Sequence, residues 1–153
     1  MTNYQGQPGM SGTQGAPTRG IAVGKFWAGA AAAALVTALS ALVATVILRV
    51  FDLMPLSPNW MPETTVAVRF AIIGFVGALI AAGLLYLLLL TTPGGDSFFG
   101  WIIGLITLAL AILPFAYDAV MGDRIATSLV HLAIGLPILG LLPGVAGRAA
   151  VWK

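Results

Sequence analysis

The only histidine of the chain lies in a polar stretch, AYDAVMGDRIATSLVHL, that separates two long apolar runs. The stretch covers residues 116–132 and holds two of the five acidic residues, Asp118 and Asp123. Histidine titrates near neutral pH, and ionisable groups inside a membrane often mark a path for protons or ions. The stretch is therefore either a working polar site in a membrane or the polar turn of a helical hairpin.

Helical spacing places Arg124, either Thr127 or Ser128, His131 and Gly135 on one face, because residues three and four apart are neighbours on a helix. Asp118 lies across the turn, where it could pair with Arg124 or accept a hydrogen bond from His131. Two interpretations remain open. The face lines a proton-, solute- or quinone-related site, or a hydrogen-bonded histidine locks the fourth helix to the third.

No residue pattern indicates catalysis or a bound cofactor. Zinc needs three or four ligands, and the chain has one histidine and no cysteine. Haem between helices usually needs a second axial ligand, and no second histidine exists. The chain has no glycine-rich phosphate loop, no nucleophile beside a base and no pair of acids on one helix face. We therefore predict a non-enzymatic protein with no catalytic residue, no metal and no cofactor.

The composition indicates an integral membrane protein. Hydrophobic residues make up 59% of the chain and charged residues 8%, whereas a soluble domain has about 25% charged residues. The formal net charge of +2 comes from scattered cations and forms no basic patch. We expect the lipid bilayer as a partner and no nucleic acid.

Four apolar runs have the length that a helix needs to cross a bilayer, about 20 residues. Turns at 91–97 (TTPGGDS) and 117–124 (YDAVMGDR) join them into hairpins, with Gly122 ending the third helix and Asp123 capping the fourth. The predicted fold is an all-α membrane protein, a four-transmembrane-helix bundle with up-down-up-down topology. The expected boundaries are a disordered tail at 1–24, a membrane domain at 25–148 with helices at about 26–48, 66–90, 98–116 and 125–142, and a C-terminus at 149–153.

Each span carries small residues at helical spacing, which allow helices to approach closely in lipid. Proline inside a membrane helix removes a hydrogen-bond donor and is expected to kink the helix. The expected kinks are at Pro114 and Pro137. The small residues expected to pack against other helices are Gly74, Ala78, Ala82, Gly100, Gly104 and Gly135.

The cations give a weak orientation signal. With both termini inside, four cations (Arg19, Lys25, Arg148, Lys153) face the cytoplasm and three (Arg49, Arg69, Arg124) face outward. We expect a plasma membrane protein with cytoplasmic termini. Arg49 and Arg69 are expected to reach towards lipid headgroups.

The segment GDRIATSLVHLAIGLPILGLLPGVAGR, residues 122–148, follows a helix that ends in LAILPF. With its Leu-Pro step and Leu-x-His-Leu helix, it resembles an actinobacterial family of four-pass membrane proteins of unknown function. The topology is similar across 26–148 and the residues across about 110–148. The resemblance implies no activity, and it marks Pro114, Asp123, Thr127, His131, Pro143 and Arg148.

Three functions fit the sequence. The first is an accessory or scaffold subunit that packs against other membrane proteins or forms a homo-oligomer. The second is a small transporter or channel component with a polar path at Asp118, Arg124 and His131. The third is a lipid- or quinone-associated membrane protein.

Overall fold

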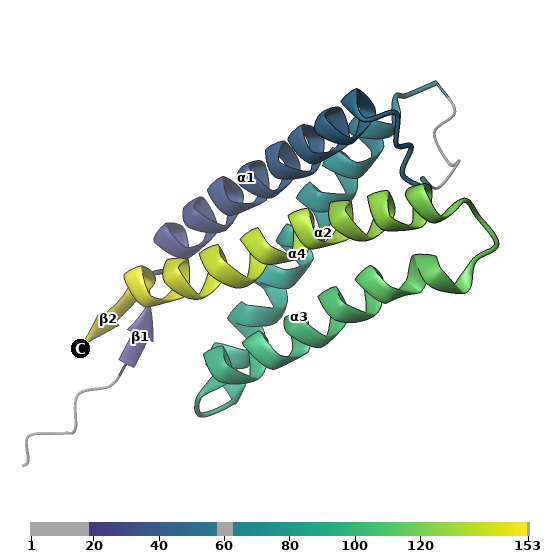
Figure 1. Cartoon of the computed structure of the whole chain (residues 1–153). Coiled ribbons are helices and arrows are strands. Elements are labelled where there is room, and N and C mark those ends of the chain that lie inside the picture. The colour runs from purple at the N-terminus through teal and green to yellow at the C-terminus, as the bar shows by residue number, and fades with distance from the viewer. Residues whose placement is uncertain (1–18, 58–62, 153) are drawn as a thin grey trace, which may run out of the picture.

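The computed structural model describes residues 19–57 and 63–152. Long helices make up most of this part of the chain, and a short strand lies at each end of it (Figure 1). The elements are β1 (Arg19–Ile21), α1 (Val23–Val50), α2 (Val66–Thr91), α3 (Gly95–Ile112), the 3-10 helix η1 (Leu113–Ala116), α4 (Met121–Ala149) and β2 (Ala150–Trp152).

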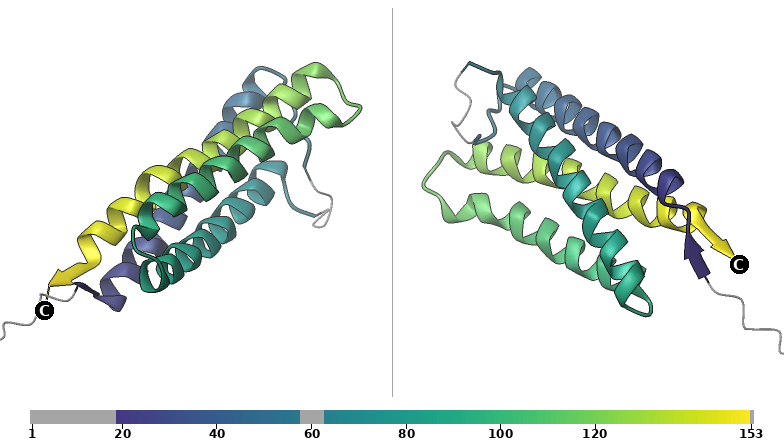
Figure 2. Two further views of the ribbon diagram at one scale, coloured as in Figure 1. Left: turned by 90° about the horizontal axis from the view of Figure 1, so that it is seen from below. Right: turned by 180° about the vertical axis from the view of Figure 1, so that it is seen from behind.

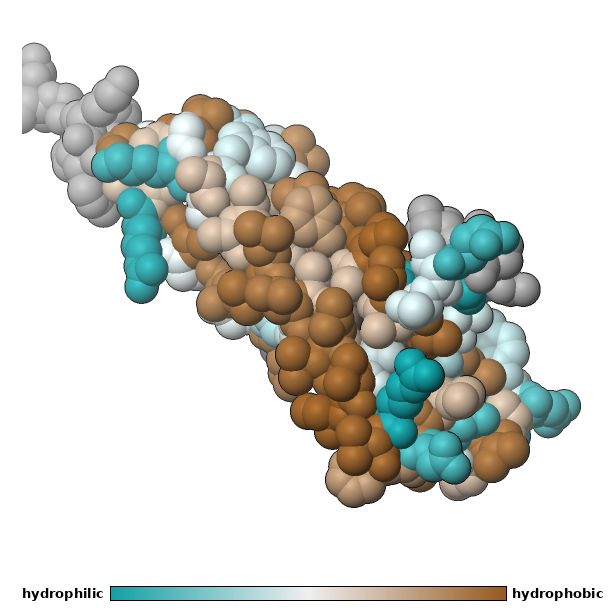
Figure 3. All heavy atoms as spheres, turned by 90° about the horizontal axis from the view of Figure 1, so that it is seen from above, coloured by the Kyte–Doolittle hydropathy of each residue, from teal (hydrophilic) through white to brown (hydrophobic). Residues whose placement is uncertain are grey.

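The four long helices are each long and apolar enough to cross a membrane. On the face seen in Figure 3, apolar side chains cover the middle of the molecule and hydrophilic side chains gather towards its two ends. Large residues such as Leu39, Ile80 and Leu105 are exposed on this apolar surface. Soluble proteins rarely expose an apolar patch of this extent to water. Lipid hydrocarbon, in contrast, surrounds such side chains without a cost in free energy. The predicted all-α, four-helix membrane bundle is thereby confirmed.

The helices alternate in direction. α1 packs against α2 and α4, and α3 packs against α4 and α2 (Figures 1 and 2). The strands and the α2–α3 turn lie at one end of the bundle, around a shared cavity. Residues 51–57 and the start of α4 meet at the other end, where the Met54 amide bonds Asp123. This arrangement is the predicted up-down-up-down order.

A two-stranded sheet joins the two ends of the described chain, and no residue pattern predicted it. β1 pairs antiparallel with β2, with Gly20 opposite Val151. A further hydrogen bond extends this pairing: the amide of Ala22, just before α1, donates to the carbonyl of Ala149, the last residue of α4, at 2.8 Å. The predicted disordered tail at 1–24 is therefore wrong for 19–24, and its first 18 residues lie outside the described part. Three-residue strands are too short to show a period of two.

The α3–α4 connection differs from its prediction. α3 ends at Ile112, and Pro114 lies in the 3-10 turn that follows, so Pro114 ends the helix and does not kink its interior. α4 begins after Val120, which places Gly122 and Asp123 in its first turn. The predicted roles of Gly122 as helix breaker and Asp123 as cap are wrong.

α4 is also longer than predicted at its C-terminal end. It continues to Ala149 through Pro137 and Pro143. In a membrane, neighbouring groups can satisfy the carbonyls that a proline leaves free, so a helix passes through proline more easily than in water.

Small residues allow close contacts between helices. A Cβ at Gly74 of α2 would lie 3.3 Å from the Thr37 carbonyl oxygen of α1. A Cβ at Gly135 of α4 would overlap the Thr107 side chain of α3, and one at Gly29 of α1 would lie 2.6 Å from Val145 of α4. Ala78 and Ala82 are fully buried on the face of α2 that carries Gly74.

Two of the expected packing residues make no such contact. A Cβ at Gly100 or Gly104 would meet no described atom of another segment within 4 Å. The buried face of α3 instead carries Ile103, Thr107 and Ala111. Gly100 and Gly104 therefore lie away from the helix contacts that the structure describes, and their packing against a helix of another protein stays a prediction.

Replacing Gly135 by alanine tests the α3–α4 contact. The added methyl overlaps Thr107, so Gly135→Ala is expected to lower the free energy of unfolding in detergent by about 1–3 kcal/mol. Gly83→Ala is the matched control, because Gly83 has no neighbour within 4 Å and gains the same helix propensity. Equal stability of the two variants would contradict the described contact.

Candidate functional site

The segment after α1 folds back onto the first turns of α4. The Leu56 amide donates to the Thr127 hydroxyl at 2.7 Å, and the Met54 amide donates to the Asp123 carboxylate at 3.3 Å. The Thr127 hydroxyl in turn donates to the Asp123 carbonyl at 2.6 Å. Pro55 prevents a helix here, so these amides need partners outside the segment. Asp123 and Thr127 therefore hold residues 54–56 against α4.

Gly122, in the first turn of α4, lies beneath this segment. A Cβ at Gly122 would lie 2.9 Å from a methyl of Leu53. Gly122 therefore leaves room for the end of the Leu53 side chain, which would shift if a Cβ were added.

Ser128 joins α4 to the end of α3. Its hydroxyl donates to the Ala111 carbonyl at 2.5 Å and lies 3.1 Å from the Arg124 carbonyl. The last carbonyls of a helix have no partner within the helix, and Ser128 satisfies one of them. Helical spacing placed either Thr127 or Ser128 on the polar face. In the structure both hydroxyls form hydrogen bonds to other segments, Thr127 to the Leu56 amide and Ser128 to the end of α3.

His131 contacts α2. Its Nδ1 donates to the Thr127 carbonyl at 2.9 Å, within its own helix. Its ring meets Phe70 of α2 edge-on, with centroids 6.1 Å apart and planes at 89°. The interpretation of His131 as a lock to the third helix is therefore wrong in its partner, since the aromatic contact is with the second helix.

The other charged residues of the predicted polar face do not meet. Asp118 is exposed, and among the described residues no ion pair joins it to Arg124 and no hydrogen bond joins it to His131. The Nε of Arg124 is buried and has no partner within the described ranges. Of the five predicted residues, Asp123 and Thr127 contact the segment after α1, and His131 contacts Phe70. Asp118 is exposed and the Arg124 Nε is buried, so the five side chains serve different contacts within the described part of the chain.

Arg69, near the start of α2, is a buried cation that sequence reasoning placed at the headgroups. Its side chain donates to the Thr64 carbonyl at 2.8 Å, to the Thr64 hydroxyl at 3.3 Å and to the Ser57 hydroxyl at 3.1 Å. Hydrogen bonds to a charged group contribute about 1.5–3 kcal/mol each. Arg69 therefore orders the return of the chain into α2. The hydroxyl residues on either side of the proline-rich loop, Ser57 and Thr64, were the one sequence feature that could have predicted these hydrogen bonds.

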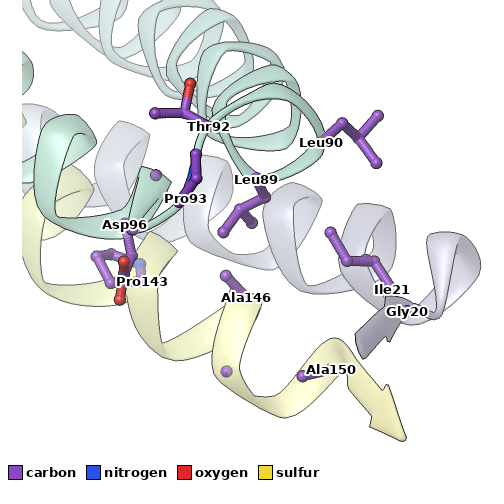
Figure 4. A pocket seen from close by; sticks show the side chains of 13 residues that line it. Gly20, Ile21, Leu89, Leu90, Thr92, Pro93, Asp96, Pro143, Ala146 and Ala150 are labelled. Atoms are coloured by element: carbon purple, nitrogen blue, oxygen red, sulfur yellow. The ribbon is translucent and has the colours of Figure 1, made fainter. Parts of the chain in front are cut away.

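Two cavities lie at opposite ends of the bundle. One, of about 400 Å³, lies between β1, the α2–α3 turn and the end of α4, with Leu89, Asp96 and Ala146 around it (Figure 4). The other, of about 470 Å³, lies between the end of α1 and the start of α2. Within the described ranges, no group of three or more potential metal-ligating side chains occurs.

Four apolar spans joined by short turns define a multi-pass membrane protein. The chain belongs to DUF6069, a family of unknown function whose model matches residues 17–150. No curated protein and no solved structure matches it. The expectation of a four-pass family without an assigned function is confirmed.

Replacing Thr127 by valine tests the loop contact. The isosteric change leaves the Leu56 amide without its acceptor, so Thr127→Val is expected to destabilise the segment by about 1 kcal/mol. Amide hydrogen exchange at 54–57 should be several-fold faster. Thr37→Val is the control, because the buried Thr37 hydroxyl bonds only its own helix, at Ala33. Unchanged exchange in Thr127→Val would show that this hydrogen bond does not hold the segment.

Proposed function

We propose that this protein is a non-enzymatic accessory or scaffold subunit that packs against other membrane proteins. One observation carries the proposal: spans α3 and α4 contain glycines at i, i+4 spacing that no other helix of the chain covers. A Cβ at any of them would meet no described atom of another segment within 4 Å. These residues are Gly100 and Gly104 of α3, and Gly140 and Gly144 of α4.

Uncovered glycines are a poor choice for a surface that meets only lipid. Glycine in a helix costs about 1 kcal/mol relative to alanine, and it gives no side chain to pack against acyl chains. Pairs four residues apart allow another helix to approach the backbone closely. Gly140 and Gly144 lie on the side of α4 opposite its buried residues Ile138 and Leu142. An approaching transmembrane helix accounts for this pattern better than lipid does.

The polar end of the bundle supports a structural role. Asp123, Thr127 and Ser128 use their side chains in hydrogen bonds within the chain. His131 bonds its own helix and packs on Phe70. These side chains close the end of the bundle rather than line an opening.

A small transporter or channel component is the second candidate. Arg124 favours it, because its Nε is buried without a partner in the described part of the chain. His131 lies two helical turns further along the same face of α4. This function requires that a proton or an ion passes along the face that carries both groups, with His131 as the group that titrates, since arginine stays protonated.

The proposed location is the plasma membrane of an actinobacterium, with both termini in the cytoplasm. The pairing of β1 with β2 supports termini on one side of the membrane. The cation count, four against three, favours the cytoplasm for that side. The family resemblance supports the organism.

Purification of the full chain in mild detergent, followed by native mass spectrometry, tests the leading proposal. We expect a defined complex with another membrane protein or with further copies. The double variant Gly140→Leu/Gly144→Leu should weaken that complex at least about tenfold, because leucine blocks close approach. Gly77→Leu/Gly83→Leu is the matched control: both glycines are open, but they are six residues apart and share no face.

Two results would contradict the accessory role. One is a monomer with no partner in native membranes. The other is a pH-dependent flux catalysed by the purified chain alone in liposomes and lost in a folded His131→Ala variant, which would favour the transporter.

A further inference from the structure

A cavity of about 470 Å³ opens between the last turn of α1, the segment that follows it and the first turn of α2. Its lining is mainly apolar, with Val46, Leu53 and Val66 among the contributing residues. Arg49 is the one charged residue among those that line it. A single cation on an apolar cavity suits a ligand with one anionic group and a long apolar part.

Arg49 is free to bind such a group. It lies in the last turn of α1 and is exposed. In the described ranges its guanidinium makes no hydrogen bond or ion pair, in contrast to Arg69, whose guanidinium bonds Ser57 and Thr64. A guanidinium presents donors in a planar fork that matches phosphate oxygens. Phosphate is therefore the anionic group that Arg49 fits.

The start of α2 adds a second positive contribution to the same cavity. Val66 and Ala67, in the first turn, both line it. Thr65 caps the helix by accepting from the Val68 amide, so the helix begins in an ordered geometry. The N-terminal end of a helix carries a partial positive charge that favours phosphate.

The cavity lies at the depth of lipid headgroups. α1 has 28 residues and is about 42 Å long, which exceeds the hydrocarbon thickness of about 30 Å. Its last turn, with Arg49, therefore extends into the headgroup region. Val50 and Met54, beside the cavity, are exposed apolar residues that can contact acyl chains.

We propose that this cavity binds the phosphate of a membrane phospholipid. Arg49 pairs with the phosphate, the first turn of α2 faces it, and the upper part of the acyl chains lies along Val46 and Val66. The site is independent of the proposed accessory role, because it needs no protein partner.

Native mass spectrometry of the purified full chain with added phosphatidylglycerol tests the site. We expect one saturable bound lipid, and at least about tenfold weaker binding by Arg49→Gln, since a charge-assisted phosphate contact is lost. Arg148→Gln is the matched control: it removes the same charge from an exposed position in the last turn of α4, away from this cavity. Equal binding by Arg49→Gln and Arg148→Gln would overturn the proposal.

Three further measurements test which ligand binds and where it binds. The variant Ala67→Phe fills the cavity and leaves Arg49 intact, so it should also weaken lipid binding while the helicity of the protein is unchanged. Full binding by this variant would overturn the assignment of the lipid to the cavity. Diacylglycerol, which lacks phosphate, should bind at least about tenfold more weakly, and equal binding would overturn the phosphate contact. Inorganic phosphate in large excess should not displace the lipid, and displacement would overturn a phospholipid as the ligand.

Discussion

Hydrocarbon does not drive apolar helices together, so this bundle depends on close approach of α4 to its neighbours. Gly135 of α4 makes room for Thr107 of α3, and Gly29 of α1 makes room for Val145 of α4. These contacts allow hydrogen bonds between helices: the Ser40 hydroxyl of α1 donates to the Ala133 carbonyl of α4 at 2.8 Å. A second hydrogen bond, from the Ser128 hydroxyl of α4 to the Ala111 carbonyl, joins α4 to α3. Side-chain hydrogen bonds therefore connect α4 to both α1 and α3.

The position of α4 also determines how the polar end is built. Its first turns offer Asp123 and Thr127 to a proline-containing segment that cannot satisfy its own amides. Arg69 then holds the chain where α2 begins. Arg49 lines the cavity between the end of α1, residues 53–55 and the start of α2. Asp123, Thr127 and Ser128 thus use their side chains in hydrogen bonds within the chain, whereas the Arg49 guanidinium makes none in the described ranges.

The sequence predicted the four spans well, because length and apolar content alone decide which segments cross a bilayer. The sequence did not predict the features that depend on contacts between segments far apart in the chain. Nothing local distinguishes Gly135, which is buried against Thr107, from Gly104, where an added Cβ would meet no described atom of another segment within 4 Å. The β1–β2 pair depends on the meeting of distant ends, and Arg69 depends on hydroxyls brought to it by the fold. Asp118 and Arg124 are near in sequence, yet Asp118 is exposed before α4 begins at Met121, whereas the Arg124 Nε is buried in the first turns of α4.

The contact between the first and last spans is the central claim, and disulfide cross-linking in native membranes tests it most directly. The chain has no cysteine, so Ser40→Cys with Ala133→Cys gives a clean pair. We predict rapid oxidation to a cross-link within one chain, and none for Ser40→Cys with Leu105→Cys, whose second position is exposed on α3. No cross-link in the first pair, or one formed only between chains, would contradict the described bundle.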